Sequence, residues 1–180
     1  MRENGFSLIE LLMGLTIVGI VLHLVSPAFA AVVESNYREE AARSLFSGMR
    51  NARSEAISRS QTVVIHGING NWSEGWRIIL DVSGKGYEDE SNPLLIERRS
   101  GIPLRVIGNR NVRTSVRFNN LGELVNGGFQ SGTVHVCAAR EPVSVHQVVL
   151  ASSGRISLRS NKAAQALCTS DSGLLQRTNA

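Results

Sequence analysis

The stretch Gly5-Phe6-Ser7-Leu8-Ile9-Glu10-Leu11-Leu12 decides the architecture of this chain. It opens an apolar run from Phe6 to Val33 in which Glu10 is the only charged residue. On insertion scales, a charged side chain at the centre of a membrane helix costs roughly 2.5–3.5 kcal/mol. A carboxylate in such a run is therefore a candidate functional group. The uncharged part from Leu11 to Val33 is long enough to span a hydrocarbon core of ~30 Å at ~1.5 Å per residue, so we expect a transmembrane helix over 6–33.

Two simpler interpretations of this segment stay open at the level of the residues. The first is an ordinary secretion signal, because Ala28-Phe29-Ala30 before Ala31 forms an Ala-x-Ala cleavage site after an apolar core of suitable length. Against it, Glu10 would lie at the start of that core. The second is a plain membrane anchor, which explains the apolar residues but gives no reason for the acid.

A glycine followed by an apolar helix with one acid at the fifth position after it resembles the type III signal of type IV prepilins. The resemblance implies that a prepilin peptidase cuts between Gly5 and Phe6 and that the new amine of Phe6 is N-methylated. It also implies that Glu10 helps to place subunits in a filament. The physical reason is that a buried carboxylate is costly unless it is paired, and the amine of a neighbouring subunit can supply the partner.

Beyond the apolar run, the sequence predicts a helix that continues over 34–60 and then a β-rich domain. The continuation has one apolar stripe at steps of three or four residues, formed by Tyr37, Ala41, Leu45, Met49, Ala52 and Ala56. Short β-branched runs follow, and Asn69-Gly70 is typical of a hairpin turn. The predicted strands are Thr62–Ile65, Trp76–Val82, Leu94–Arg99, Arg105–Ile107, Thr114–Phe118, Thr133–Cys137, Val143–Leu150 and Arg155–Leu158.

The predicted fold class is therefore α+β, with a long N-terminal α-helix packed on an antiparallel β-sheet domain. The expected divisions are a leader over 1–5, the membrane helix over 6–33, its amphipathic continuation over 34–60 and a globular domain over 61–180. Residues after Asn161 are expected to be polar and irregular, held in place through Cys168.

Both cysteines, Cys137 and Cys168, lie outside the apolar run. In an exported domain they predict a disulfide, which would close a loop of about 30 residues and contribute roughly 3–4 kcal/mol in the chain-entropy model. Two unpaired buried thiols are the alternative. No CxxC motif or His/Cys pair with zinc spacing is present, so we expect no metal site.

The globular part resembles the GspH/FimT family of minor pseudopilins of type II secretion and minor pilins of type IV pili. The resemblance rests on Arg59–Ile65, Asn71–Asp81, Val116–Asn119, Gly122, Gly128, Thr133–Cys137 and Ser153–Arg155. It implies a type IV pilin-like fold and a structural subunit that helps to initiate or cap a pilus or pseudopilus, with other major and minor pilins or pseudopilins as partners. It also implies a single-pass protein of the bacterial inner membrane with a periplasmic C-terminal domain, which later enters the filament.

The formal net charge of +4 is unevenly spread, with six arginines between Glu97 and Arg117. A clustered basic face is the electrostatic footprint of a DNA binder. FimT proteins of transformable bacteria carry a late Gly-Arg-x-Arg motif that binds DNA, and Gly154-Arg155-Ile156-Ser157-Leu158-Arg159 resembles it with the second arginine displaced by two. The alternative function is therefore a pilus-borne receptor for double-stranded DNA through Arg155 and Arg159. A solvated surface, or one that binds anionic lipid or an acidic neighbouring subunit, is the competing interpretation.

Nothing in the sequence favours an enzyme. His66, His135 and His146 lack metal-ligand spacing, and there is no nucleophile elbow, HExxH motif or P-loop. The stretch Asp81-x-Ser83-x-Lys85-Gly86 is weakly similar to a calcium loop, but Lys85 would place a cation where a ligand belongs. We expect no catalytic residues and no cofactor.

Overall fold

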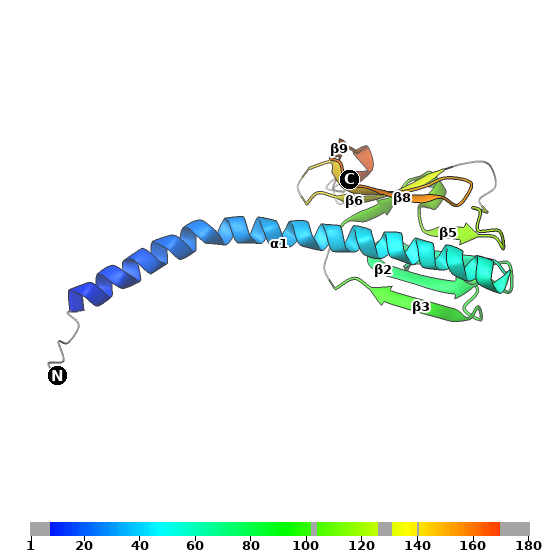
Figure 1. Ribbon diagram of the computed structural model, residues 1–180, viewed down its shortest axis with the longest axis horizontal. Coiled ribbons are helices and arrows are strands. Elements are labelled where there is room, and N and C mark those ends of the chain that lie inside the picture. Colours follow the sequence, from blue (N-terminus) through cyan, green and yellow to red (C-terminus); the bar gives the residue numbers. More distant parts are fainter. Residues whose placement is uncertain (1–7, 102–103, 126–130, 140, 170–180) are drawn as a thin grey trace, which may run out of the picture. The chain divides into compact units, whose positions relative to one another are not determined.

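The computed structural model describes residues 8–101, 104–125, 131–139 and 141–169, except for the side chains of residues 24–28. The chain divides into two compact units, one ending at Tyr37 and the other beginning at Arg38. Helix α1 (Leu8–Arg59) contributes to both units (Figure 1). The predicted helix therefore ends one residue before its expected boundary.

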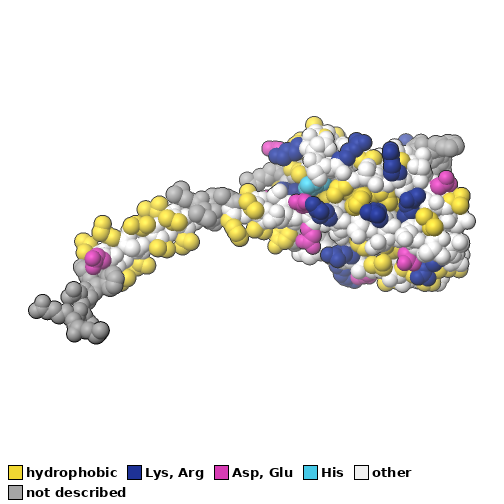
Figure 2. All heavy atoms as spheres, viewed as in Figure 1, with side chains coloured by type: hydrophobic (Ala, Val, Ile, Leu, Met, Phe, Trp, Pro, Cys, Tyr) yellow, Lys and Arg dark blue, Asp and Glu magenta, His cyan; other side chains and the backbone are white. Residues whose placement is uncertain are grey.

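In the first unit, helix α1 exposes large apolar side chains, and Figure 2 shows them along the face in view. The large apolar residues from Leu8 to Leu22 are each more than half exposed, although they occupy nearly consecutive positions. A helix that is apolar all round is normally covered by lipid or by other protein. Within the described residues, no helix is long and apolar enough to qualify as a membrane-crossing segment. The transmembrane assignment of 6–33 stays a prediction, since part of that range lies outside the described residues.

In the second unit, the remaining part of α1 buries one stripe of small and apolar residues. Ala42, Leu45, Met49, Ala52 and Ala56 are almost fully buried, which confirms four of the six predicted stripe positions. The prediction is wrong at its first two positions, because Tyr37 is 39% exposed and Ala41 is only half-buried, and the buried stripe begins at Ala42. Both alanines lie about one turn before Leu45, so spacing alone does not choose between them.

Two antiparallel sheets pack against this part of α1 (Figure 1). The first has the strand order β3-β2-β1-β5, formed by β3 (Leu94–Arg99), β2 (Asn71–Leu80), β1 (Val63–Ile68) and β5 (Ser115–Phe118). The second has the order β4-β6-β7-β8, formed by β4 (Val106–Gly108), β6 (Gly132–Cys137), β7 (Val143–Leu150) and β8 (Ile156–Arg159). A short strand, β9 (Ala163–Ala164), pairs with β7. Three 3-10 turns complete the described elements: η1 (Gly86–Glu88), η2 (Arg110–Val112) and η3 (Ala166–Cys168).

The β1–β2 hairpin turns at Asn69-Gly70, as predicted. Both residues have positive φ, 53° and 73°, which is the conformation that a two-residue type I′ turn requires. Strand β2 begins directly after the turn at Asn71, so the predicted start at Trp76 is wrong by five residues. Polar side chains at Asn71, Ser73 and Glu74 made this part look like a loop, but they occur on a strand that also buries Trp72.

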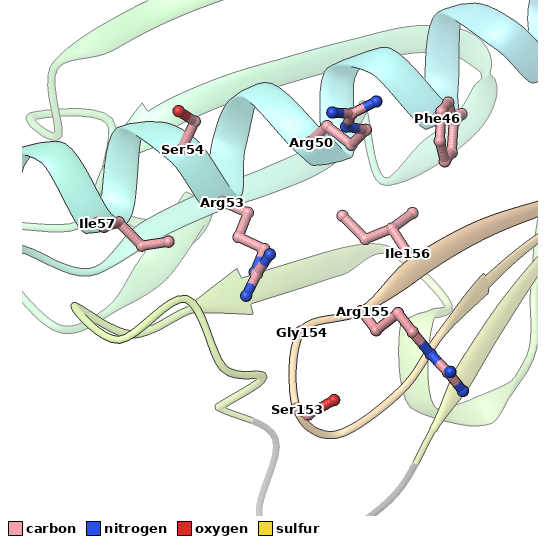
Figure 3. A pocket seen from close by; sticks show the side chains of 9 residues that line it. All are labelled: Phe46, Arg50, Arg53, Ser54, Ile57, Ser153, Gly154, Arg155 and Ile156. Atoms are coloured by element: carbon pink, nitrogen blue, oxygen red, sulfur yellow. The ribbon is translucent and has the colours of Figure 1, made fainter.

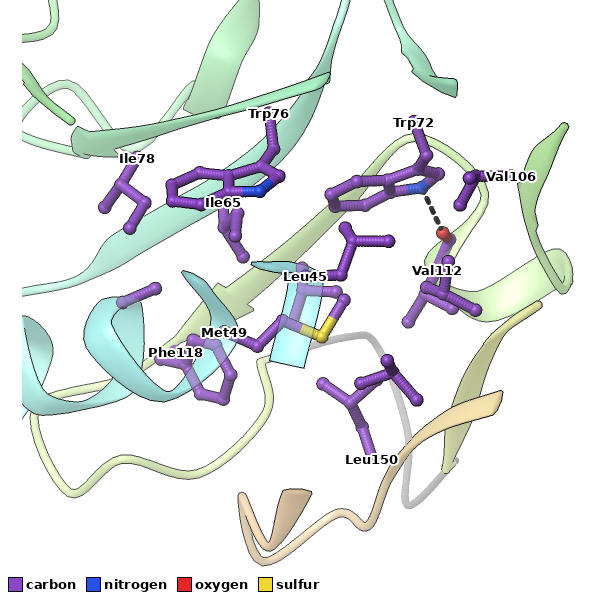
Figure 4. Close-up of a cluster of buried hydrophobic side chains, with 14 of the residues drawn as sticks. Leu45, Met49, Ile65, Trp72, Trp76, Ile78, Val106, Val112, Phe118 and Leu150 are labelled. Atoms are coloured by element: carbon purple, nitrogen blue, oxygen red, sulfur yellow. Dashed lines mark hydrogen bonds between the residues drawn. The ribbon is translucent and has the colours of Figure 1, made fainter. Parts of the chain in front are cut away.

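The two tryptophans of β2 lie in the core between the sheets and α1 (Figure 4). The indole of Trp72 donates a hydrogen bond to the Val112 carbonyl at 3.0 Å, and that of Trp76 donates to Ser44 Oγ at 3.2 Å. Gly48 lets α1 approach the Trp76 ring, because a Cβ there would lie 2.8 Å from it. Both tryptophans therefore serve packing of the core.

Candidate functional site

Glu10 lies in the first described turn of α1. It is exposed, and it stands among exposed apolar neighbours such as Leu8, Ile9 and Leu11. An ionisable group on an otherwise apolar helix is suited to pair with an opposite charge when that helix is buried in an assembly. Gly5 and Phe6, the predicted processing site, lie outside the described residues.

Cys137 and Cys168 form the predicted disulfide, which excludes the alternative of two unpaired thiols. Both cysteines are almost fully buried. The bond joins the end of β6 to the segment 160–169, which we call the C-terminal strap. This segment was predicted to be irregular, but it contains β9 and η3.

Polar side chains of the second sheet hold the C-terminal strap in addition to the disulfide. Gln147 Nε2 donates to the Asn161 carbonyl at 2.9 Å, and Gln165 Nε2 lies 3.2 Å from His135 Nε2. His135 Nδ1 lies 3.1 Å from the hydroxyl of the fully buried Ser144. Burial lowers the pKa of His135, so its neutral form is favoured in the folded chain.

The two arginines predicted to bind DNA are both exposed, but they lie at opposite ends of β8. Arg155 precedes the strand, and Arg159 is its last residue, paired with Gln147 of β7. Arg155 lines a hollow of about 520 Å³ to which Arg159 does not contribute. Arg155 therefore shares this hollow with other residues and not with Arg159, the arginine with which it was predicted to bind DNA.

This hollow, which we call the basic groove, lies between α1 and the turn before β8 (Figure 3). Its lining residues are Phe46, Arg50, Arg53, Ser54, Ile57, Ser153, Gly154, Arg155 and Ile156. Sequence reasoning missed Arg50 and Arg53, which read only as the polar face of an amphipathic helix. Their one distinguishing signal was their spacing of three residues, which puts both side chains on the same face.

Arg53 is fixed in place by two tight turns. Its Nε donates to the Gly122 carbonyl at 2.9 Å. Gly122 and Gly154 both have φ of +75°, and a Cβ on Gly154 would lie 1.7 Å from the Gly122 carbonyl oxygen. The turns can meet at Arg53 only because both positions are glycine.

Within the described residues, no group of three or more His, Cys, Asp or Glu side chains could hold a metal ion. In the stretch weakly similar to a calcium loop, Asp81 accepts a hydrogen bond from the Gly86 N–H at 2.9 Å and forms an ion pair with Arg117 at 3.0 Å. Protein groups therefore already compensate the charge of this carboxylate.

A helix that begins in an N-terminal methylation motif and then packs on antiparallel sheets defines a pilin-like filament subunit. The model of the prokaryotic N-terminal methylation motif matches residues 1–26, and that of the type II transport protein GspH matches residues 41–154. The chain belongs to the GspH family. Its function is that of a minor pilin or pseudopilin.

Solved structures of a type IV minor pilin share the fold. The structure of FimU from Pseudomonas aeruginosa aligns with a TM-score of 0.59 at 21% identity, covering 74% of this chain and 97% of FimU. A second crystal form of FimU gives a TM-score of 0.56 at 22% identity, covering 71% and 98%. A comparison with curated protein sequences gives no match.

Proposed function

We propose that the chain is a structural subunit, without catalytic activity, that helps to initiate or cap a type IV pilus or a type II secretion pseudopilus. The observation that carries this proposal is Glu10 on a helix whose large apolar side chains are exposed on every side, within a methylation motif. Such a helix needs a covering of lipid or protein, and packing against other pilin helices in a filament supplies it.

Processing follows from the same motif. A prepilin peptidase cuts between Gly5 and Phe6, and Phe6 becomes the methylated N-terminus. Before assembly, residues 6–33 anchor the chain in the bacterial inner membrane, and the C-terminal domain lies in the periplasm, where the Cys137–Cys168 disulfide can form. Afterwards the subunit enters the filament.

The mass and N-terminal sequence of the mature chain from membranes test this processing. A chain that starts at methylated Phe6 is the expected result. A chain that starts at Ala31 would mean a secreted domain without the apolar helix, and the filament proposal would be abandoned.

Assembly is tested by Glu10→Gln, which keeps the shape of the side chain and removes its charge. We expect the variant to be processed and to stay in the membrane fraction but to be strongly depleted from sheared filaments, because a neighbour's amine would lose its partner. The matched control is Glu39→Gln, which removes an exposed carboxylate paired with Arg43 at 2.7 Å and contributes little. Equal incorporation of both variants would contradict the role of Glu10.

For the alternative of a DNA receptor, no specific observation favours the pair Arg155 and Arg159, since only one of them lines the basic groove.

A further inference from the structure

We propose that the basic groove binds an acidic segment of a neighbouring filament subunit, one that carries carboxylates next to apolar side chains. Its carboxylates would contact Arg50, Arg53 and Arg155, and its apolar side chains would pack on the exposed Ile57. This inference rests on the proposed function, because the neighbour is a subunit of the same filament.

The arginines around the basic groove carry positive charge that no described carboxylate compensates. Within the described residues, Arg50, Arg53 and Arg155 form no ion pair. Other described arginines do pair with a carboxylate, among them Arg43, Arg59, Arg77, Arg98, Arg99 and Arg117. Three unpaired guanidinium groups around one hollow favour an anionic ligand, and guanidinium is well suited to bidentate contacts with carboxylate.

The two arginines on the helix side of the groove are held in place before a ligand binds. Arg53 is anchored through Nε, so its two remaining nitrogens can face a ligand without a loss of side-chain freedom on binding. The guanidinium of Arg50 stands 5.6 Å from the centroid of the Phe46 ring, which restrains it by a cation–π contact. In Figure 3, Arg53 points from α1 toward the turn with Gly154, whereas Arg155 lies on the opposite side of the groove and points away from the helix.

The apolar surroundings of the groove favour a protein ligand over a nucleic acid. Phe46, Ile57 and Ile156 line the groove beside the arginines. Ile57 is 46% exposed and Leu121 is 67% exposed, and a Cβ on the neighbouring Gly122 would lie 2.7 Å from Ile57 Cδ1. Large exposed apolar side chains next to arginine and an aromatic ring are typical of the centre of a protein interface, whereas a phosphate backbone offers nothing to cover them. Figure 2 likewise shows hydrophobic side chains among Lys and Arg on one face of this unit.

The test uses the full chain in cells that assemble its filament, with a photo-cross-linking amino acid in place of Ser54, an exposed residue of the groove. The groove variant is Arg50→Glu with Arg155→Glu, and Arg53 is kept because it supports the fold. The matched control is Arg110→Glu with Arg113→Glu, which makes the same change in net charge at two exposed arginines outside the groove.

We expect an adduct with another pilin subunit, mapped by mass spectrometry to a segment with Asp or Glu beside apolar residues. Its yield should fall at least about tenfold in the groove variant, because like charges would then face each other, and should be unchanged in the control. An adduct in a segment without acids, equal yields in the two variants, or no adduct from chains that are present in filaments would overturn the groove proposal alone. Absence of the unaltered chain from filaments would overturn the proposed function as well.

Nucleic acid is tested separately with the purified full chain in detergent and a fluorescent DNA duplex. No difference in binding between the groove variant and the control supports a protein ligand. Binding that is lost in the groove variant and kept in the control would assign the groove to DNA and overturn the proposal.

Discussion

Replacing both cysteines by alanine, C137A with C168A, should lower the stability of the second unit without changing its fold. The disulfide closes a loop with a sequence separation of 31 residues. In the chain-entropy model, releasing this loop in the unfolded chain corresponds to about 3.7 kcal/mol at 25 °C. The variant keeps the hydrogen bond from Gln147 to Asn161 and the one between Gln165 and His135, which also hold the C-terminal strap, so the loss should not exceed this value by much.

The free energy converts into a thermal shift through the entropy of unfolding. For a unit that spans residues 38–180, an unfolding entropy of ~2.1 cal/mol/K per residue gives a decrease in the midpoint of about 12 °C. The assay is thermal unfolding of the full chain in detergent, followed by near-ultraviolet circular dichroism. Reductant should shift the unaltered chain by a similar amount and leave the variant unchanged. A shift below about 2 °C in both experiments would refute the reasoning that the bond constrains the unfolded chain.

Three further predictions concern the same unit. Gly154→Ala should destabilise it by at least about 2 kcal/mol, measured by urea unfolding, because φ is +75° and the new Cβ would clash with the Gly122 carbonyl oxygen; a loss below about 0.5 kcal/mol would show that the turns can separate. Trp72→Phe should cost about 1–3 kcal/mol or more in the same assay, since it leaves the Val112 carbonyl without its buried donor; a neutral effect would mean that water replaces the indole. Stability should fall as pH decreases from 7.5 to 5. Burial holds the pKa of His135 below its ordinary 6.5, so the unfolded chain binds a proton at this residue at a higher pH than the folded chain does. His135→Gln should flatten the pH dependence of stability, and an unchanged slope would contradict the role of His135.

Much of the fold could be predicted because local patterns and tertiary packing agree. The β-branched runs at Val63–Ile65 and Val143–Leu150 are strands, and Asn69-Gly70 forms the turn that its preference for positive φ indicates. The early start of β2 could not be predicted, since Asn71, Ser73 and Glu74 are polar and this part of the strand depends on tertiary pairing. Asn71 pairs with Ile68 of β1, and Gly75 pairs with Arg99 of β3. Likewise, the choice of Ala42 over Ala41 depends on how the sheets pack against α1.

The site was predictable where a motif is local in sequence and unpredictable where it is assembled by the fold. Glu10 stands out in the sequence because it is the only charge in an apolar run. The basic groove combines α1 with the turn before β8, about 100 residues later, and no short motif links Arg53 to Gly154. The disulfide is an intermediate case, because two cysteines allow only one pairing but do not show what the bond holds in place.

The packing of α1 on both sheets has a mechanical consequence. A force along the helix axis acts at the same time on the contacts of Leu45, Met49 and Ala52 and on the hydrogen bond from Arg53 to Gly122. These contacts must therefore break together, in shear. Strands at a sheet edge, by contrast, can peel one hydrogen bond at a time. Because forced unfolding is governed by the unfolding rate, this arrangement suits a subunit that must keep its shape under tension.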